Sequence, residues 1–189
     1  MENNLSYATL EDVVRQNYAT VVWTHKIQEK QGDLDQKKYH AMEVINIICA
    51  SLTTAGVVGM FFESCIWVKL ATALCSFATI FCGAYFKSFN VQETIEKHRI
   101  AAQKLLEIRN KMILLIAKIQ LKNGRVDELM KEYEILLNEL HRIYETAPST
   151  SNKAVDEATT ALFDKQDYTF SDNEIDRFLP NDLRKDPTK

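Results

Sequence analysis

The chain has 189 residues, and its 26 acidic and 23 basic residues give a formal net charge of −3. This is the length of one ordinary domain, and the near balance of charge excludes a strong basic field, so no direct nucleic-acid binding is expected. Only 5 glycines and 3 prolines occur. Because Pro148, Pro180 and Pro187 all lie in the last quarter, little interrupts long helices before them, and the sequence predicts an all-α fold.

The first expected region, residues 1–43, is amphipathic, helical and cytoplasmic. Gly32 and Asp33 predict a break in its helix. No basic segment leads into an apolar core at the start of the chain, so we expect the later membrane segment to remain in the mature protein. The apolar residues fall near one helical face, at Leu5, Leu10, Val13, Val14, Tyr18, Val21, Val22 and His25.

Residues 44–86 predict a transmembrane hairpin with spans at 44–62 and 66–86. The first span, VINIICASLTTAGVVGMFF, carries no charge, and at about 1.5 Å per residue it can cross a ~30 Å hydrocarbon core. The alternative is a soluble buried hairpin, but two spans this apolar would need an unusually large covering surface. The residues expected at the membrane interfaces are Glu63, Trp67, Lys69, Tyr85 and Lys87.

Basic residues in the short flanks predict the orientation. Near the turn between the spans the only basic residue is Lys69, whereas each outer flank contains several basic residues. Both termini should therefore be cytoplasmic. The flanking residues are Lys26, Lys30, Lys37 and Lys38 before the first span, and Lys87, Lys97, Arg99 and Lys104 after the second.

Each span has one stripe of small or mildly polar residues at helical spacing. Two uses compete for these stripes: close helix packing, as in Ala55-x-x-x-Gly59, or the lining of a water-filled path in an oligomer. The carboxamide of Asn46 needs a partner in hydrocarbon, either in another copy or on a hydroxyl of the second span, which favours a homo-oligomer. The stripes are Asn46, Cys49, Thr53 and Gly56, and then Thr72, Ser76, Thr79 and Gly83.

Residues 87–147 predict a cytoplasmic helical hairpin whose first helix continues the second span. Asn123 and Gly124 predict its turn. The expected buried residues are Ile95, Ala102, Leu105, Ile108, Met112, Leu115 and Ile119, and then Met130, Tyr133, Leu137, Leu140 and Tyr144.

Residues 148–189 form a polar tail with short helices. One is expected over 154–163, and Ser171 with Glu174 forms the capping box of another, on which Ile175, Phe178 and Leu179 would make a small docking face.

No catalytic, cofactor-binding or metal motif occurs: there is no Gly-rich phosphate loop, no paired Cys or His spacing and no nucleophile elbow. We expect neither an enzyme nor a bound cofactor. The four cysteines, Cys49, Cys65, Cys75 and Cys82, fall in the apolar block or its turn and are interpreted as small apolar side chains.

The layout resembles the SLATT proteins, the SMODS- and SLOG-associating two-transmembrane effectors of bacterial conflict systems, over roughly the whole chain. The segments that carry the resemblance are Trp23-Thr24-His25-Lys26, AMEVINIICASLTTAGVVGMFF, the short turn with Trp67, FKSFNVQETIEKHRIAAQKLLEIRN, and YEILLNELHRIYETAPSTSNKAVDEA.

The resemblance implies an antiviral membrane effector of the bacterial inner (cell) membrane that oligomerises and breaches this lipid bilayer in an infected cell, leading to abortive infection. Its trigger would be a separate sensor, nucleotide-signalling or reverse-transcriptase partner. It brings no catalytic residue. Two other functions stay open: a membrane anchor or scaffold that tethers a cytosolic partner, and an accessory subunit of a transporter or channel.

Overall fold

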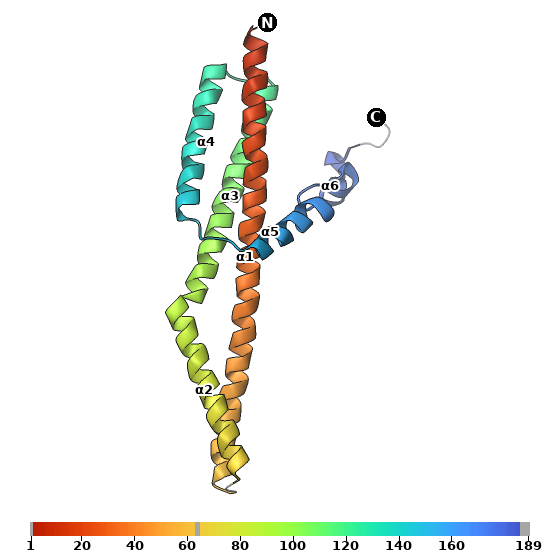
Figure 1. The fold of residues 1–189 in the computed structure, drawn as a ribbon. Helices are drawn as coiled ribbons and strands as arrows, with labels where there is room; N and C mark the ends of the chain where they lie inside the picture. The colour runs from red at the N-terminus through yellow and green to blue at the C-terminus, as the bar shows by residue number, and fades with distance from the viewer. Residues whose placement is uncertain (1, 63–64, 186–189) are drawn as a thin grey trace.

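The computed structural model describes the backbone of residues 2–62 and 65–185, and the side chains in those ranges from Ser6 onward. Every regular element in them is a helix (Figure 1), which confirms the all-α prediction. In chain order these are α1 (Glu2–Met60), α2 (Ile66–Phe89), α3 (Val91–Gln120), α4 (Val126–Thr146), α5 (Asn152–Thr159), the π-helical turn η1 (Thr160–Asp164), α6 (Asp172–Phe178) and the 3-10 turn η2 (Asn181–Leu183).

Helix α1 is the scaffold of the molecule. It has 59 residues and is therefore roughly 90 Å long. Figure 1 shows α2 alongside one half of it, α3 and α4 alongside the other, and α5 leaving from the middle. The expected cytoplasmic helix and the first span are thus one rod, so a displacement of the cytoplasmic half can be transmitted to the apolar half.

The predicted break at Gly32 and Asp33 is wrong, because α1 runs through both residues. Gly32 is buried against α3, where an added Cβ would lie 3.6 Å from the Cβ of His98. A glycine inside a helix costs about 1 kcal/mol relative to alanine. Packing against α3 and α5 outweighs that penalty, so tertiary contacts override the local signal.

The helix that was expected to continue the second span is separated from it by a bend. Asn90 adopts a left-handed conformation, with φ 44° and ψ 44°, which ends α2 and precedes α3. Asparagine is one of the few residues that enter this region readily. The resulting bend is visible in Figure 1, and it separates the apolar hairpin from the bundle of α1, α3 and α4.

The main hydrophobic core lies between α1, α3 and α4. All seven residues predicted to be buried on α3 are buried, from Ile95 to Ile119. On α4 two of the five predicted residues, Tyr133 and Leu140, are buried, whereas Met130 and Tyr144 are 40% and 39% exposed. The face of α4 that packs into the core lies about one residue earlier, at Leu129, Tyr133, Leu136, Leu140 and Ile143.

The C-terminal region is attached to the middle of α1. Ala154 and Ala158 of α5 pack against Ile27 and Leu34 in a second cluster. The predicted capping box is confirmed, since the backbone N–H of Ser171 donates to Glu174 at 2.8 Å. The expected docking face on α6 is not docked onto the chain, because Ile175 is 42% and Phe178 81% exposed.

Candidate functional site

The two apolar helices α1 and α2 meet at a very close contact between Gly56 and Thr72. A Cβ added to Gly56 would overlap Thr72 Oγ1 and would lie 3.1 Å from both Cβ and Cγ2 of that residue. Small residues allow helix backbones to approach in this way, and in a membrane such packing is a main source of association energy. Glycine at position 56 is therefore required by the hairpin geometry.

Seven of the eight predicted stripe residues are at least partly covered: Thr72 is buried and the other six are half-buried. Gly83 is the exception, because it is exposed and an added Cβ would meet nothing within 4 Å. Ala55 is exposed and the added Cβ of Gly59 also meets nothing. The covered stripe residues are Asn46, Cys49, Thr53, Gly56, Thr72, Ser76 and Thr79, joined by Cys75 and Cys82.

The threonine hydroxyls of the stripes are satisfied within their own helices. Thr53 donates to Cys49 O at 2.8 Å, and Thr79 donates to Cys75 O at 3.0 Å. They do not bond across the hairpin to Asn46: among the described residues, the buried Oδ1 of Asn46 has no hydrogen-bond partner. The single chain leaves this one carboxamide oxygen unpaired.

The outward faces of the hairpin are apolar. Helices α1 and α2 are both long and apolar enough to cross a membrane, and their apolar windows are 0% and 11% buried within the molecule. A buried soluble hairpin would have covered side chains instead. The exposed side chains include Ile45, Ile48, Leu52, Val58, Leu70, Leu74, Phe77 and Ile80.

Aromatic residues mark two levels on the hairpin. Trp67 is 73% exposed near the start of α2, and Tyr85 stacks on Phe89 with ring centroids 4.7 Å apart near its end. The 18 residue steps from 67 to 85 span about 27 Å, close to the hydrocarbon thickness. Lys69 and Lys87 are exposed at the same two levels. Glu63, also predicted at the interface, lies outside the described residues.

A polar layer lies where the bundle meets the hairpin. His98 is 1% exposed, and its Nδ1–H donates to Gln28 Oε1 at 2.6 Å, while its Nε2 lies 3.8 Å from Asp35. Burial lowers the pKa of His98, although Asp35 opposes that shift. Gln28 also donates to Pro148 O at 3.2 Å, so the layer connects α1, α3 and the C-terminal region.

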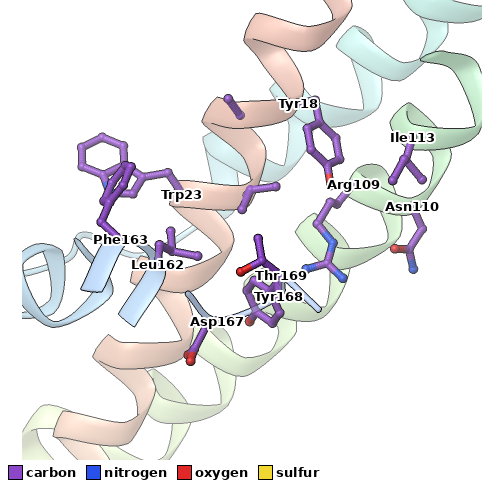
Figure 2. A pocket seen from close by; sticks show the side chains of 12 residues that line it. Tyr18, Trp23, Arg109, Asn110, Ile113, Leu162, Phe163, Asp167, Tyr168 and Thr169 are labelled. Atoms are coloured by element: carbon purple, nitrogen blue, oxygen red, sulfur yellow. The ribbon is translucent and has the colours of Figure 1, made fainter. Parts of the chain in front are cut away.

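Next to the polar layer on α1, Tyr168 from the C-terminal segment packs between two cationic side chains. Its ring centroid lies 4.5 Å from Lys26 Nζ and 4.6 Å from the guanidinium carbon of Arg109. Figure 2 shows the side chains of Arg109 and Tyr168 next to each other. Its hydroxyl donates to Glu29 at 2.6 Å, and Lys26 also pairs with Asp167 at 2.8 Å. We call these five residues the clasp, because they attach residues 167–168 to α1 and α3.

The hydrogen bonds of the clasp favour the ionised form of Glu29. Burial would raise the pKa of Glu29, but hydrogen bonds from Tyr168 and Lys26 outweigh it and the pKa is lowered. The neighbouring His25 has a lowered pKa because it is buried and because Arg109 and Lys26 lie near it. Sequence reasoning missed the clasp, since a tyrosine in a polar tail carries no periodic signal that could pair it with a lysine on α1.

No group of three His, Cys, Asp or Glu residues within 2–62 and 65–185 is arranged to hold a metal ion. A family model described as "SMODS and SLOG-associating 2TM effector domain family 4" matches residues 10–174. Neither the curated proteins nor the solved structures contain a match to the chain. The family match covers the hairpin, the bundle, the polar layer and the clasp.

Proposed function

Because the chain belongs to the family of SMODS and SLOG-associating two-transmembrane effector domains, we propose that it permeabilises the bacterial inner membrane as a homo-oligomer when a conflict-system partner activates it. Two helices cannot enclose a lumen, so several copies must contribute. The trigger is a separate sensor, nucleotide-signalling or reverse-transcriptase protein. With both termini cytoplasmic, the bundle faces that partner.

The observation that carries the proposal is the unpaired oxygen of Asn46. A buried carboxamide oxygen without a donor costs free energy in hydrocarbon. The remaining polar groups of the stripes also face the hairpin interior, so a single chain presents an apolar surface to lipid. Reassociation of the hairpins, with Asn46 bonded to another copy, would satisfy this oxygen and turn the stripes toward a shared water-filled path.

The continuous rod α1 supports a mechanism of activation. The polar layer and the clasp hold the C-terminal region against α1, and α1 also forms half of the hairpin. A partner that binds another arrangement of the bundle shifts the population of hairpin arrangements by its difference in affinity. The conformation described here is then the closed one, in which Gly56 and Thr72 remain in contact.

A second candidate function is a membrane anchor or scaffold. It is favoured by the close packing of the stripes and by exposed apolar side chains on the bundle, such as Ile113, Leu114 and Ile135. An anchor would hold a cytosolic partner at the membrane without changing the membrane's permeability.

Purified chain in dye-loaded liposomes, with and without the products of neighbouring genes, separates the two functions. The effector proposal expects dye release that rises steeply with protein concentration and falls in Thr79→Leu. Thr54→Leu is the matched control, since Thr54 is exposed on the same apolar block and outside the stripes. Retention of dye under every condition, with partner recruited to the liposomes, would establish the anchor.

A further inference from the structure

A cavity of about 460 Å³ lies next to the clasp, between α1, α3 and the C-terminal segment (Figure 2). That volume falls in the range of small-molecule sites. Three parts of the chain that are distant in sequence build it, so the cavity exists only while residues 162–169 are docked. The lining residues that matter for recognition are Tyr18, Trp23, Arg109, Phe163, Tyr168 and Thr169.

The two ends of this cavity differ in chemistry. Trp23 and Phe163 line one end together with Leu162, and Figure 2 shows them on the side away from Arg109. These two residues are 40% and 72% exposed, so aromatic surface is open to a ligand. Flat rings bind well to such surfaces, by area burial and by offset or edge contacts.

At the other end, Arg109 has an unmet hydrogen-bonding group. Its guanidinium lies over the ring of Tyr168, a contact that uses the face of the group and leaves the in-plane N–H donors available. Among the described residues, the buried Nη1 has no hydrogen-bond partner. A buried charged donor without an acceptor costs more free energy than a neutral one, and the Arg109 side chain lines the cavity, so a small rotation of the guanidinium would bring this donor to an oxygen from outside the chain.

The nearby carboxylates cannot serve that purpose, because other groups occupy them. Glu29 accepts from Tyr168 and Lys26, and Asp167 pairs with Lys26. Lys26, Glu29, Asp167 and Arg109 together carry no net charge, so these groups create no positive field that would attract a polyanion. A single anionic group would be held by its direct contact with Arg109.

We propose that this cavity binds a small aromatic anion, a flat ring bearing one carboxylate or phosphate group. The ring lies against Trp23 and Phe163, and the anionic oxygens accept from Arg109. Because the ligand contacts α1, α3 and residues 162–169 at once, its binding stabilises the docked C-terminal segment. This site is independent of the proposed membrane permeabilisation.

The test uses the full chain in lipid nanodiscs. The chain has two tryptophans, so Trp67→Phe leaves Trp23 as the only tryptophan, which can be excited selectively at the red edge of its absorption. The probes are adenosine monophosphate and para-hydroxybenzoate as phosphate and carboxylate aromatic anions. The separate parts are adenosine and inorganic phosphate for the first, and phenol and acetate for the second. We expect at least one aromatic anion to change Trp23 fluorescence saturably, with a Kd of about 1 mM or tighter, and each separate part to bind at least tenfold more weakly.

The variants locate the site. Arg109→Gln should weaken binding about tenfold or more, because one charge-assisted hydrogen bond is lost. Lys104→Gln removes the same charge from an exposed position on α3 and should leave binding unchanged. Phe163→Ala, at a largely exposed residue, should weaken binding without affecting the fold, which keeps the test valid if Arg109→Gln proves unstable.

Which of the two aromatic anions binds identifies the anionic group. The proposal is overturned if neither binds, if adenosine binds as well as its monophosphate, or if Arg109→Gln and Phe163→Ala bind as tightly as the wild-type chain.

Discussion

Thr72 leaves no room for a side chain at residue 56: a Cβ there would lie 3.1 Å from Thr72 Cβ and would overlap its hydroxyl oxygen. Gly56→Ala should therefore lower the free energy of unfolding of the hairpin by about 1–3 kcal/mol, the usual cost of overpacking. Thermal unfolding in detergent, followed by circular dichroism, measures it.

Gly59→Ala is the matched control, because its new Cβ meets nothing within 4 Å, and it should not lower stability. Thr72→Ala in the Gly56→Ala background should restore part of the loss by removing Oγ1 and Cγ2. Equal destabilisation by the two glycine substitutions would contradict the proposed packing.

Asn46→Leu should weaken association between copies while leaving the single chain at least as stable. Its oxygen has no partner in the chain, so the substitution removes a desolvation cost and no intramolecular bond to that oxygen. Membrane hydrogen bonds of this kind contribute about 0.6–2 kcal/mol. Energy transfer between labelled copies in liposomes measures the association, and an unchanged association constant would remove Asn46 from the interface.

The hairpin could be predicted from sequence because hydrophobicity and length alone decide whether a helix can span a membrane. The stripes were largely placed as expected, since a period of 3.6 residues puts Cys49, Thr53 and Gly56 on one face. Gly83 is exposed because at its level the face of α2 that packs runs through Cys82 and Phe86 instead. Continuity through Gly32 and the docking of Tyr168 both depend on tertiary contacts, which local patterns do not contain.

Tyr168→Leu should release the C-terminal segment from α1. The substitution removes two cation–π contacts and the hydrogen bond to Glu29, a loss of about 1–3 kcal/mol. Limited proteolysis should then cut residues 160–170 several-fold faster than in the wild-type chain. Tyr168→Phe keeps the ring and should fall between the two, whereas equal rates for all three chains would show that the clasp does not hold the segment.

Acidification should destabilise the bundle through His98. Burial lowers its pKa from the ordinary value of 6.5, so the unfolded chain binds a proton more readily than the native one. Its contribution to stability is therefore complete above that value and is lost as the pH falls toward the lowered pKa.

The temperature of the unfolding midpoint should fall less between neutral and mildly acidic pH in His98→Gln than in the wild-type chain. The fall that remains in the variant is attributed to His25, whose pKa is also lowered. His141→Gln, at an exposed position on α4, should behave as wild type. The same pH dependence in the His98 variant would contradict the assignment.

The most direct test of membrane permeabilisation is membrane potential and dye uptake in bacteria induced to express the full chain. The variants are Asn46→Leu and Thr79→Leu, with Thr54→Leu as control; Thr72→Leu is unsuitable because it would clash with the helix at Gly56. We expect depolarisation by the wild-type chain and Thr54→Leu that is lost in the two stripe variants. Polarised cells throughout, even with the neighbouring genes and phage present, would contradict the proposed effector function.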